Sequence, residues 1–241
     1  MFYFDPFSIL IMVVGGAISG LAAMWVKGSF ARYSQVGARN GMSGAQVADA
    51  ILRFHHIHDV SIEPTPGELS DHYDPTSKTL RLSEQNFHGR SVAALGVAAH
   101  EVGHAIQHAQ NYAWLNFRSS MVPVVNFSSR FSMILLMGGM LLMAFMKGAG
   151  AFGHTVAIAG VGLFAMTTLF SLITLPVEFD ASRRALIALR DGHILDGEEL
   201  VGARRVLRAA AATYVAAAVT SLMWLLYYAW RLGLIGGRSR D

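Results

Sequence analysis

Cysteine is absent from the 241-residue chain, and charged residues make up only 15% of it. Without cysteine there is no disulfide framework, no thiolate metal site and no thiol nucleophile. So little charge beside 53% hydrophobic residues is not the composition of an ordinary soluble domain. The formal net charge is only +3, and the cations flank apolar segments, so no nucleic-acid binding is predicted. The composition indicates a polytopic membrane protein.

Four apolar segments are long enough to cross a bilayer, which takes about 20 residues of helix. The first, residues 6–26, lacks the basic flank and the cleavage site of a signal peptide, so we interpret it as a retained anchor. The second is centred on residues 131–146, the third is 152–175 and the fourth is 209–232; a short turn that includes Lys147 separates the second from the third.

Residues 91–107, SVAALGVAAHEVGHAIQ, carry the most specific motif of the chain. Residues four apart share one helix face, so His100 and His104 can bind one metal ion while Glu101 lies beside a bound water. This HExxH arrangement is typical of zinc metalloproteases, in which zinc lowers the pKa of its water to about 7 and the glutamate takes the proton. The alternative, two histidines that merely flank a turn of a buried helix, leaves three polar groups buried without a partner. We therefore predict one Zn²⁺ ion.

A third protein ligand is needed, and the nearest histidine does not qualify. His108 lies eight residues beyond His100, a helical rise of roughly 12 Å, which is too far for both to share one ion. The segment PVEFDASRRALIALRDG begins at Pro176, whose fixed φ suits the first turn of a new helix. Glu178 lies in that turn, where the helix dipole favours a carboxylate. We predict Glu178 as the third ligand; an ordinary glutamate on a surface helix remains the alternative.

Asp180 follows in the same segment but has closer partners. Arg183 and Arg184 are its i+3 and i+4 neighbours and offer it ion pairs. We therefore expect Asp180 to support the site from outside the ligand set, or to be structural.

A small β-structure is predicted before the HExxH helix. Residues 60–63, 70–73 and 79–82 have the pattern of short strands, and Asp74-Pro75 opens the turn of a hairpin. An extended substrate can pair with an exposed sheet edge, and we expect 79–82 to be that edge. The alternative is a hairpin that only covers the zinc helix. The residues of the expected edge strand are Thr79, Leu80, Arg81 and Leu82, and the candidate donors to the oxyanion are His72, Tyr73, Arg183 and Arg184.

Topology provides an independent check on the metal site. Four spans place residues 27–130 and 176–208 on one side of the membrane, as Glu178 requires if it is to meet the two histidines. These two segments carry fifteen of the nineteen Lys and Arg residues, which by the positive-inside rule makes that side cytoplasmic. Arg231, Arg238 and Arg240 lie on the other side and oppose this orientation.

The fold class expected is mainly α: a polytopic helical membrane protein with about four transmembrane helices and a small α+β zinc-protease domain. The expected division is a first transmembrane helix at 1–26, a cytoplasmic α+β part with the HExxH helix at 27–120, two transmembrane helices at 121–175, the helix with the third ligand and a connector at 176–208, and a last transmembrane helix and tail at 209–241.

The segment HEVGHAIQH, with SDHYDPTSKTLRLSE before it and TLPVEFDASRRAL after it, resembles the YugP-like membrane zinc metallopeptidases of bacteria. The resemblance covers nearly the whole chain and implies a neutral zinc peptidase in the bacterial cytoplasmic membrane. It implies His100, His104 and Glu178 as ligands and Glu101 as the catalytic base. The resemblance also relates the site to the gluzincins, the zinc peptidases in which a downstream glutamate is the third ligand. Membrane gluzincins carry an aspartate four residues after that glutamate, where this chain has Ser182.

The function expected is a membrane-embedded zinc endopeptidase that hydrolyses membrane or membrane-associated proteins. Its partners are then a polypeptide substrate and the lipid bilayer, with a homo-oligomer or a membrane-protein partner left open. The alternative is a non-catalytic scaffold or adaptor stabilised by zinc, against which the intact Glu101 argues. A transporter is disfavoured, because the spans lack paired intramembrane carboxylates.

Overall fold

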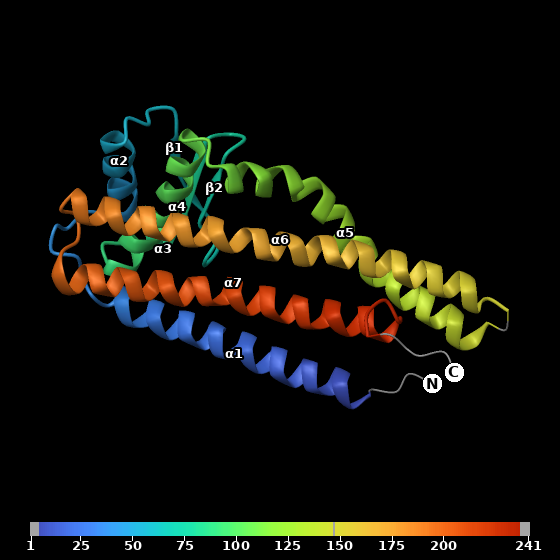
Figure 1. The fold of residues 1–241 in the computed structure, drawn as a ribbon. Coiled ribbons are helices and arrows are strands. Elements are labelled where there is room, and N and C mark those ends of the chain that lie inside the picture. The colour runs from blue at the N-terminus through green and yellow to red at the C-terminus, as the bar shows by residue number, and fades with distance from the viewer. Residues whose placement is uncertain (1–4, 147, 237–241) are drawn as a thin grey trace. The chain divides into compact units, whose positions relative to one another are not determined.

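The computed structural model describes residues 5–146 and 148–236, and these residues are mainly helical (Figure 1). The predicted turn residue Lys147 and the end of the tail, with Arg238 and Arg240, lie outside the described residues. The helices are α1 (Pro6–Ser34), α2 (Gly44–Phe54), α3 (Glu84–Phe87), α4 (Val92–Ala109), α5 (Ala113–Phe145), α6 (Gly150–Asp191) and α7 (Gly197–Arg231), and the strands are β1 (Ser61–Thr65), β2 (His72–Asp74) and β3 (Thr79–Ser83).

The chain divides into two compact units. One draws its described residues from 1–21, 117–174 and 214–241, and the other consists of 22–116 and 175–213. The helices α1, α5, α6 and α7 are each long and apolar enough to cross a membrane. The predicted fold class, a helical membrane protein with four spans and a small sheet, is confirmed.

Glycines let α5 and α6 approach closely in the first unit. A Cβ on Gly139 would lie 2.4 Å from the backbone nitrogen of Ala157, and one on Gly160 would lie 2.3 Å from that of Leu136. Such contacts are typical of membrane helices, which associate through small residues and tight packing.

Helix α6 continues through Pro176, so the prediction of a new helix that starts there was wrong. Proline removes one backbone hydrogen bond from a helix interior, and here the helix tolerates that loss. The residues that follow are well packed, since Val177 and Ala181 are fully buried. Glu178 therefore sits inside a long helix, without the favourable dipole of a helix N-terminus.

The second unit is built around α4, whose residues are almost all buried. Its neighbour α2 begins with a capping box, in which Ser43 accepts from the backbone nitrogen of Gln46 and the Gln46 side chain accepts in return. The apolar face of α2, with Val47 and Ile51, joins α4 and β3 in one hydrophobic core.

The three strands form a sheet in the order β1-β3-β2. The pair β1–β3 is parallel and the pair β2–β3 is antiparallel, with Asp74 opposite Thr79 at the predicted hairpin turn. The prediction that 79–82 forms an edge strand was wrong. The chain crosses over after β1 and places β2 on the other side of β3, so β3 is central, and both Leu80 and Leu82 are fully buried. In the described part of the sheet, the edges are β1 and β2.

Candidate metal centre

Helix α4 and helix α6 approach each other closely at Gly103. A Cβ built on Gly103 would lie 2.4 Å from the carbonyl oxygen of Ala181. Real Cβ atoms do not come so close to backbone, so only glycine permits this approach. Gly103 directly precedes His104 on α4, and Ala181 lies three residues after Glu178 on α6. The close approach therefore brings the two histidines and Glu178 within reach of one another.

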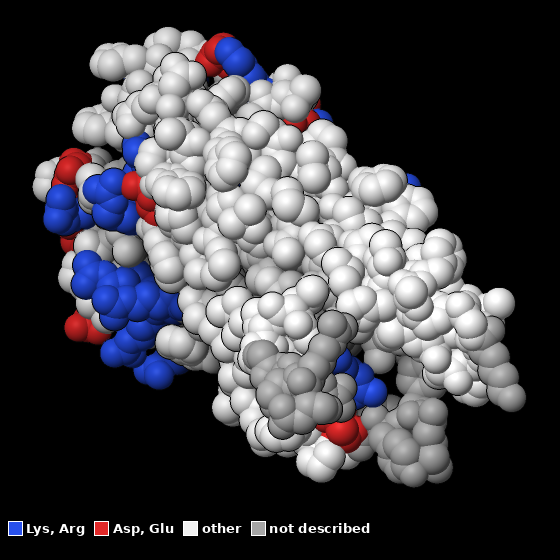
Figure 2. All heavy atoms as spheres, turned by 45° about the vertical axis from the view of Figure 1, so that its right-hand side comes forward, with Lys and Arg blue, Asp and Glu red and all other residues white. Residues whose placement is uncertain are grey.

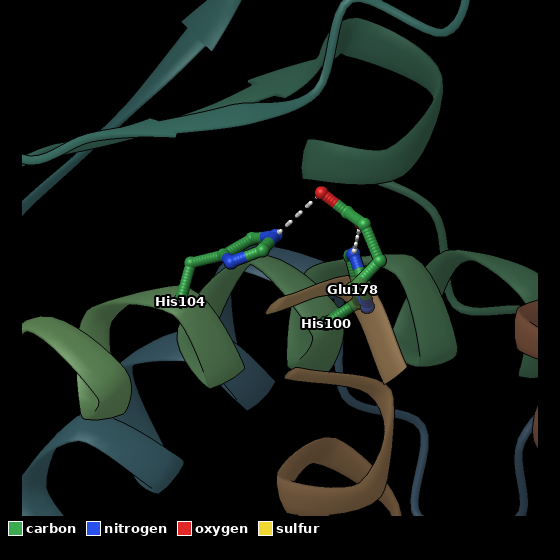
Figure 3. A group of neighbouring side chains, drawn as sticks. All are labelled: His100, His104 and Glu178. Carbon is green, nitrogen blue, oxygen red and sulfur yellow. Dashed lines mark hydrogen bonds and ion pairs between the residues drawn. The ribbon is translucent and has the colours of Figure 1, made fainter. Parts of the chain in front are cut away.

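His100, His104 and Glu178 point toward one another (Figure 3). Nε2 of His100 lies 3.2 Å from Oε2 of Glu178, and Nε2 of His104 lies 3.7 Å from Oε1. One ligand atom from each residue falls within 4.8 Å of the others, and in the described residues this is the group that can hold a metal ion. Glu178 and His104 are buried, with 2% and 7% of their surface exposed. His108, which the sequence excluded as a ligand, is not in the group.

The donor set fits zinc. Two imidazole nitrogens and one carboxylate oxygen are the ligands of catalytic zinc sites that keep a fourth position open for water or substrate. This group therefore supports one zinc ion as the cofactor.

The outer nitrogens of both imidazoles have their own partners. Nδ1 of His100 lies 3.2 Å from the hydroxyl of Ser182, and Nδ1 of His104 lies 3.0 Å from Oε1 of Gln107. The Gln107 amide nitrogen donates to the carbonyl of Val177 at 2.8 Å, so its oxygen is left to accept. His104 therefore carries its proton on Nδ1, and its Nε2 lone pair is free for a metal.

Gln107 was missed by the sequence analysis. It is fully buried and also donates to Oδ2 of Asp180 at 3.0 Å. Asp180 in turn pairs with Arg183 and Arg184, and Gln107 connects it to His104. A signal was present in the sequence, because a glutamine three residues after His104 in a helix faces the same side as that histidine.

Glu101 lies beside the group and is buried, with 7% of its surface exposed. Burial raises the pKa of its carboxyl group to about 7, while the neighbouring His100 opposes that shift. The backbone N–H of Tyr73 lies near this carboxylate and lowers its pKa slightly. Because Tyr73 belongs to β2, Glu101 lies against the edge of the sheet.

The four candidate oxyanion donors make their hydrogen bonds elsewhere. Nδ1 of His72 lies 2.8 Å from the carbonyl of Ser70, and the hydroxyl of Tyr73 lies 2.8 Å from Nδ1 of His108. Burial raises the pKa of Tyr73 to about 12, so its hydroxyl keeps its proton. The two arginines pair with Asp180. Their role at the oxyanion stays a prediction.

Comparison with known proteins agrees with this geometry. A family model described as "Putative neutral zinc metallopeptidase" matches residues 8–232. A curated relative from Bacillus subtilis (strain 168), "Putative membrane protease YugP", is 44% identical over 223 residues, which cover 91% of this chain and 94% of the relative. No solved structure matches the chain.

Proposed function

The chain belongs to the neutral zinc metallopeptidase family, and from that premise we propose that it is a membrane-embedded endopeptidase that cuts membrane or membrane-associated proteins. The observation that supports this proposal most is the convergence of His100, His104 and Glu178 beside a buried Glu101. A metal that only held the fold together would have no use for a carboxylate in the position of Glu101.

In this mechanism His100, His104 and Glu178 would hold the ion, and Ser182 and Gln107 would orient the two imidazoles. Zinc bound there would act as a Lewis acid and would lower the pKa of a coordinated water. Glu101 accepts a proton from the attacking water at its carboxylate and returns it to the nitrogen of the leaving amine.

We place the substrate along the free edge of β2 instead of along β3. An extended peptide that adds to a sheet edge forms main-chain hydrogen bonds independent of its side chains. Two observations support β2: β3 is flanked on both sides, and β2 packs against α4 with the backbone of Tyr73 near the carboxylate of Glu101. A substrate strand at this edge would pass the base directly.

The proposal also includes an orientation, in which the second unit lies on the cytoplasmic side because most of the cations do. Fifteen of the nineteen Lys and Arg residues fall in 27–130 and 176–208. The bacterial cytoplasmic membrane is then the location, with substrates cut near its inner surface.

The test uses the full chain, purified in detergent, with zinc content and cleavage of an unfolded general substrate such as β-casein as readouts. Glu101→Gln is expected to retain about one zinc per chain and to lose activity by roughly a hundredfold to ten-thousandfold. His104→Ala is expected to lose the zinc. Glu198→Gln, on an exposed glutamate in the first turn of α7, is the matched control and is expected to behave like the wild type.

Comparative proteomics of membranes that contain wild type or Glu101→Gln identifies the substrates. Activity that survives in metal-free protein would rule the mechanism out. If Glu101→Gln left all membrane proteins unchanged while His100→Ala unfolded the chain, the scaffold hypothesis would replace the peptidase.

A further inference from the structure

A groove of about 430 Å³ lies between α1 and α7 within the second unit. Its lining includes Trp25, Gly28 and Arg32 of α1 and Arg205 of α7. The two helices are in direct contact beside it, because Arg205 donates a hydrogen bond to the hydroxyl of Tyr33 at 3.0 Å. Nothing in the proposed peptidase mechanism uses this groove.

The cations around the groove have no acidic partners among the described side chains. Within the residues that the structure describes, no carboxylate pairs with any Lys or Arg of α1 or with the arginines of the first half of α7: Lys27, Arg32, Arg204, Arg205 and Arg208. Elsewhere in the same unit, Arg39, Arg53, Lys78, Arg81 and Arg190 all pair with a carboxylate. Figure 2 shows basic side chains gathered where α1 ends and α7 begins. This surface is therefore suited to anions from outside the chain.

In both helices the boundary between the apolar and the charged part lies at the groove. The apolar run of α1 ends at Val26 and is followed by Lys27, whereas α7 carries its arginines up to Arg208 and becomes apolar from Ala209. The two helices run in opposite directions (Figure 1), and Tyr33 of α1 contacts Arg205 of α7, so the two changes occur at about the same level. Trp25 is half exposed at this level, which is typical of the boundary between membrane and water.

We propose that this groove binds the phosphate of an anionic glycerophospholipid in the leaflet on the side of the metal centre. Guanidinium groups match phosphate oxygens through paired, charge-assisted hydrogen bonds. Basic pockets between membrane helices are suited to lipid head groups. Arg32 and Arg205 contact the phosphate, and the exposed side chains of Met24 and Trp25 lie against the start of the acyl chains.

Gly28 allows the site to be blocked without a change in charge. No atom lies within 4 Å of a Cβ built on Gly28, so Gly28→Phe fills the groove without a clash at its base. Gly20, also on α1, is equally open and does not line the groove, so Gly20→Phe is the matched steric control. For charge, Arg32→Gln and Arg205→Gln are the test variants, and Arg53→Gln, on an exposed arginine of α2 outside this basic surface, is the control.

The experiment measures thermal stabilisation and lipid retention of the full chain in detergent, by thermal unfolding and native mass spectrometry. Added phosphatidylglycerol is expected to raise the unfolding temperature and to remain bound, because a ligand that binds only the folded state stabilises it. Phosphatidylcholine, a zwitterionic lipid, is expected to do neither. Arg32→Gln, Arg205→Gln and Gly28→Phe each weaken phosphatidylglycerol binding by about tenfold or more, while both controls bind like the wild type.

Three results would overturn the proposal. Equal stabilisation by phosphatidylcholine would show that the groove does not select lipids with a net negative charge. An equal effect of soluble glycerol 3-phosphate would show that the groove binds a soluble phosphate compound and not a lipid. Identical binding by Gly28→Phe and Gly20→Phe would place the lipid outside the groove, and zinc content and helical circular dichroism distinguish this result from misfolding.

Discussion

Gly103 of α4 and Ala181 of α6 touch backbone to backbone, and a Cβ on Gly103 would lie 3.0 Å from the carbonyl carbon of Ala181 and closer still to its oxygen. This contact sets the distance between the helix that carries the two histidines and the helix that carries Glu178. The geometry of the candidate metal centre therefore depends on a residue with no side chain.

Gly103→Ala is expected to force the two helices apart. Overpacking of this kind costs about 1–3 kcal/mol of folding free energy, and separation of Glu178 from the histidines weakens zinc binding as well. The measurement is the thermal unfolding of the zinc-loaded protein together with its zinc affinity. Gly96→Ala is the control in the same helix, because a Cβ there meets Ala203 at an ordinary 3.4 Å. Equal behaviour of the two variants would show that the contact does not position the ligands.

Gln107→Leu is expected to lower zinc affinity by roughly tenfold to a hundredfold, the usual effect of removing a hydrogen-bond partner from a metal-binding histidine. Leucine has a similar volume but cannot accept a hydrogen bond from the Nδ1–H group of His104, so the imidazole loses its fixed tautomer. Competition with a zinc chelator measures the change. Gln35→Leu, on an exposed glutamine far along the chain from the site, controls for the substitution itself, and an equal affinity in both variants would contradict the role of Gln107.

Tyr73→Phe is expected to change how stability depends on alkaline pH. The pKa of Tyr73 is about 12 in the folded chain, against roughly 10 for an unfolded one. The protonated Tyr73 hydroxyl therefore contributes its full share of the unfolding free energy below pH 10, and this share is lost as the pH rises toward 12. The wild type should lose more unfolding free energy than Tyr73→Phe between pH 9 and 11.5. The other tyrosines ionise in both proteins and cancel in the difference.

The difference in unfolding free energy between wild type and Tyr73→Phe is measured by thermal unfolding of the metal-free proteins at each pH. Between pH 7 and 9 it should stay constant, which serves as the internal control. A constant difference up to pH 11.5 would mean that the Tyr73 hydroxyl is not protected by its burial beside His108.

The absence of native cysteine permits a direct test of orientation. A membrane-impermeant maleimide added to intact cells is expected to label Gly150→Cys, at the start of α6, and not Thr76→Cys, in the turn between β2 and β3. Both positions are exposed, and a Cβ on Gly150 meets no atom within 4 Å. Disrupted membranes should label both variants. Labelling of Thr76→Cys alone in intact cells would reverse the orientation inferred from the cations.

Local patterns in the sequence were enough to predict the four spans, the HExxH helix and the short strands. Each of these depends on residues within a few positions of one another, such as the four-residue spacing of His100 and His104. The sequence also pointed to Glu178, which the structure brings beside the two histidines. Its supporting argument was wrong, however, because Pro176 lies inside α6 and does not start a helix.

The sequence by itself determined the class of protein and the residue types of the metal centre, since composition, apolar length and helical spacing are local properties. Only the tertiary structure decided the order of the strands, the close approach of Gly103 to Ala181 and the link from His104 through Gln107 to Asp180. These depend on which distant segments pack together, and a strand can lie at the centre or the edge of a sheet with the same alternation of its side chains.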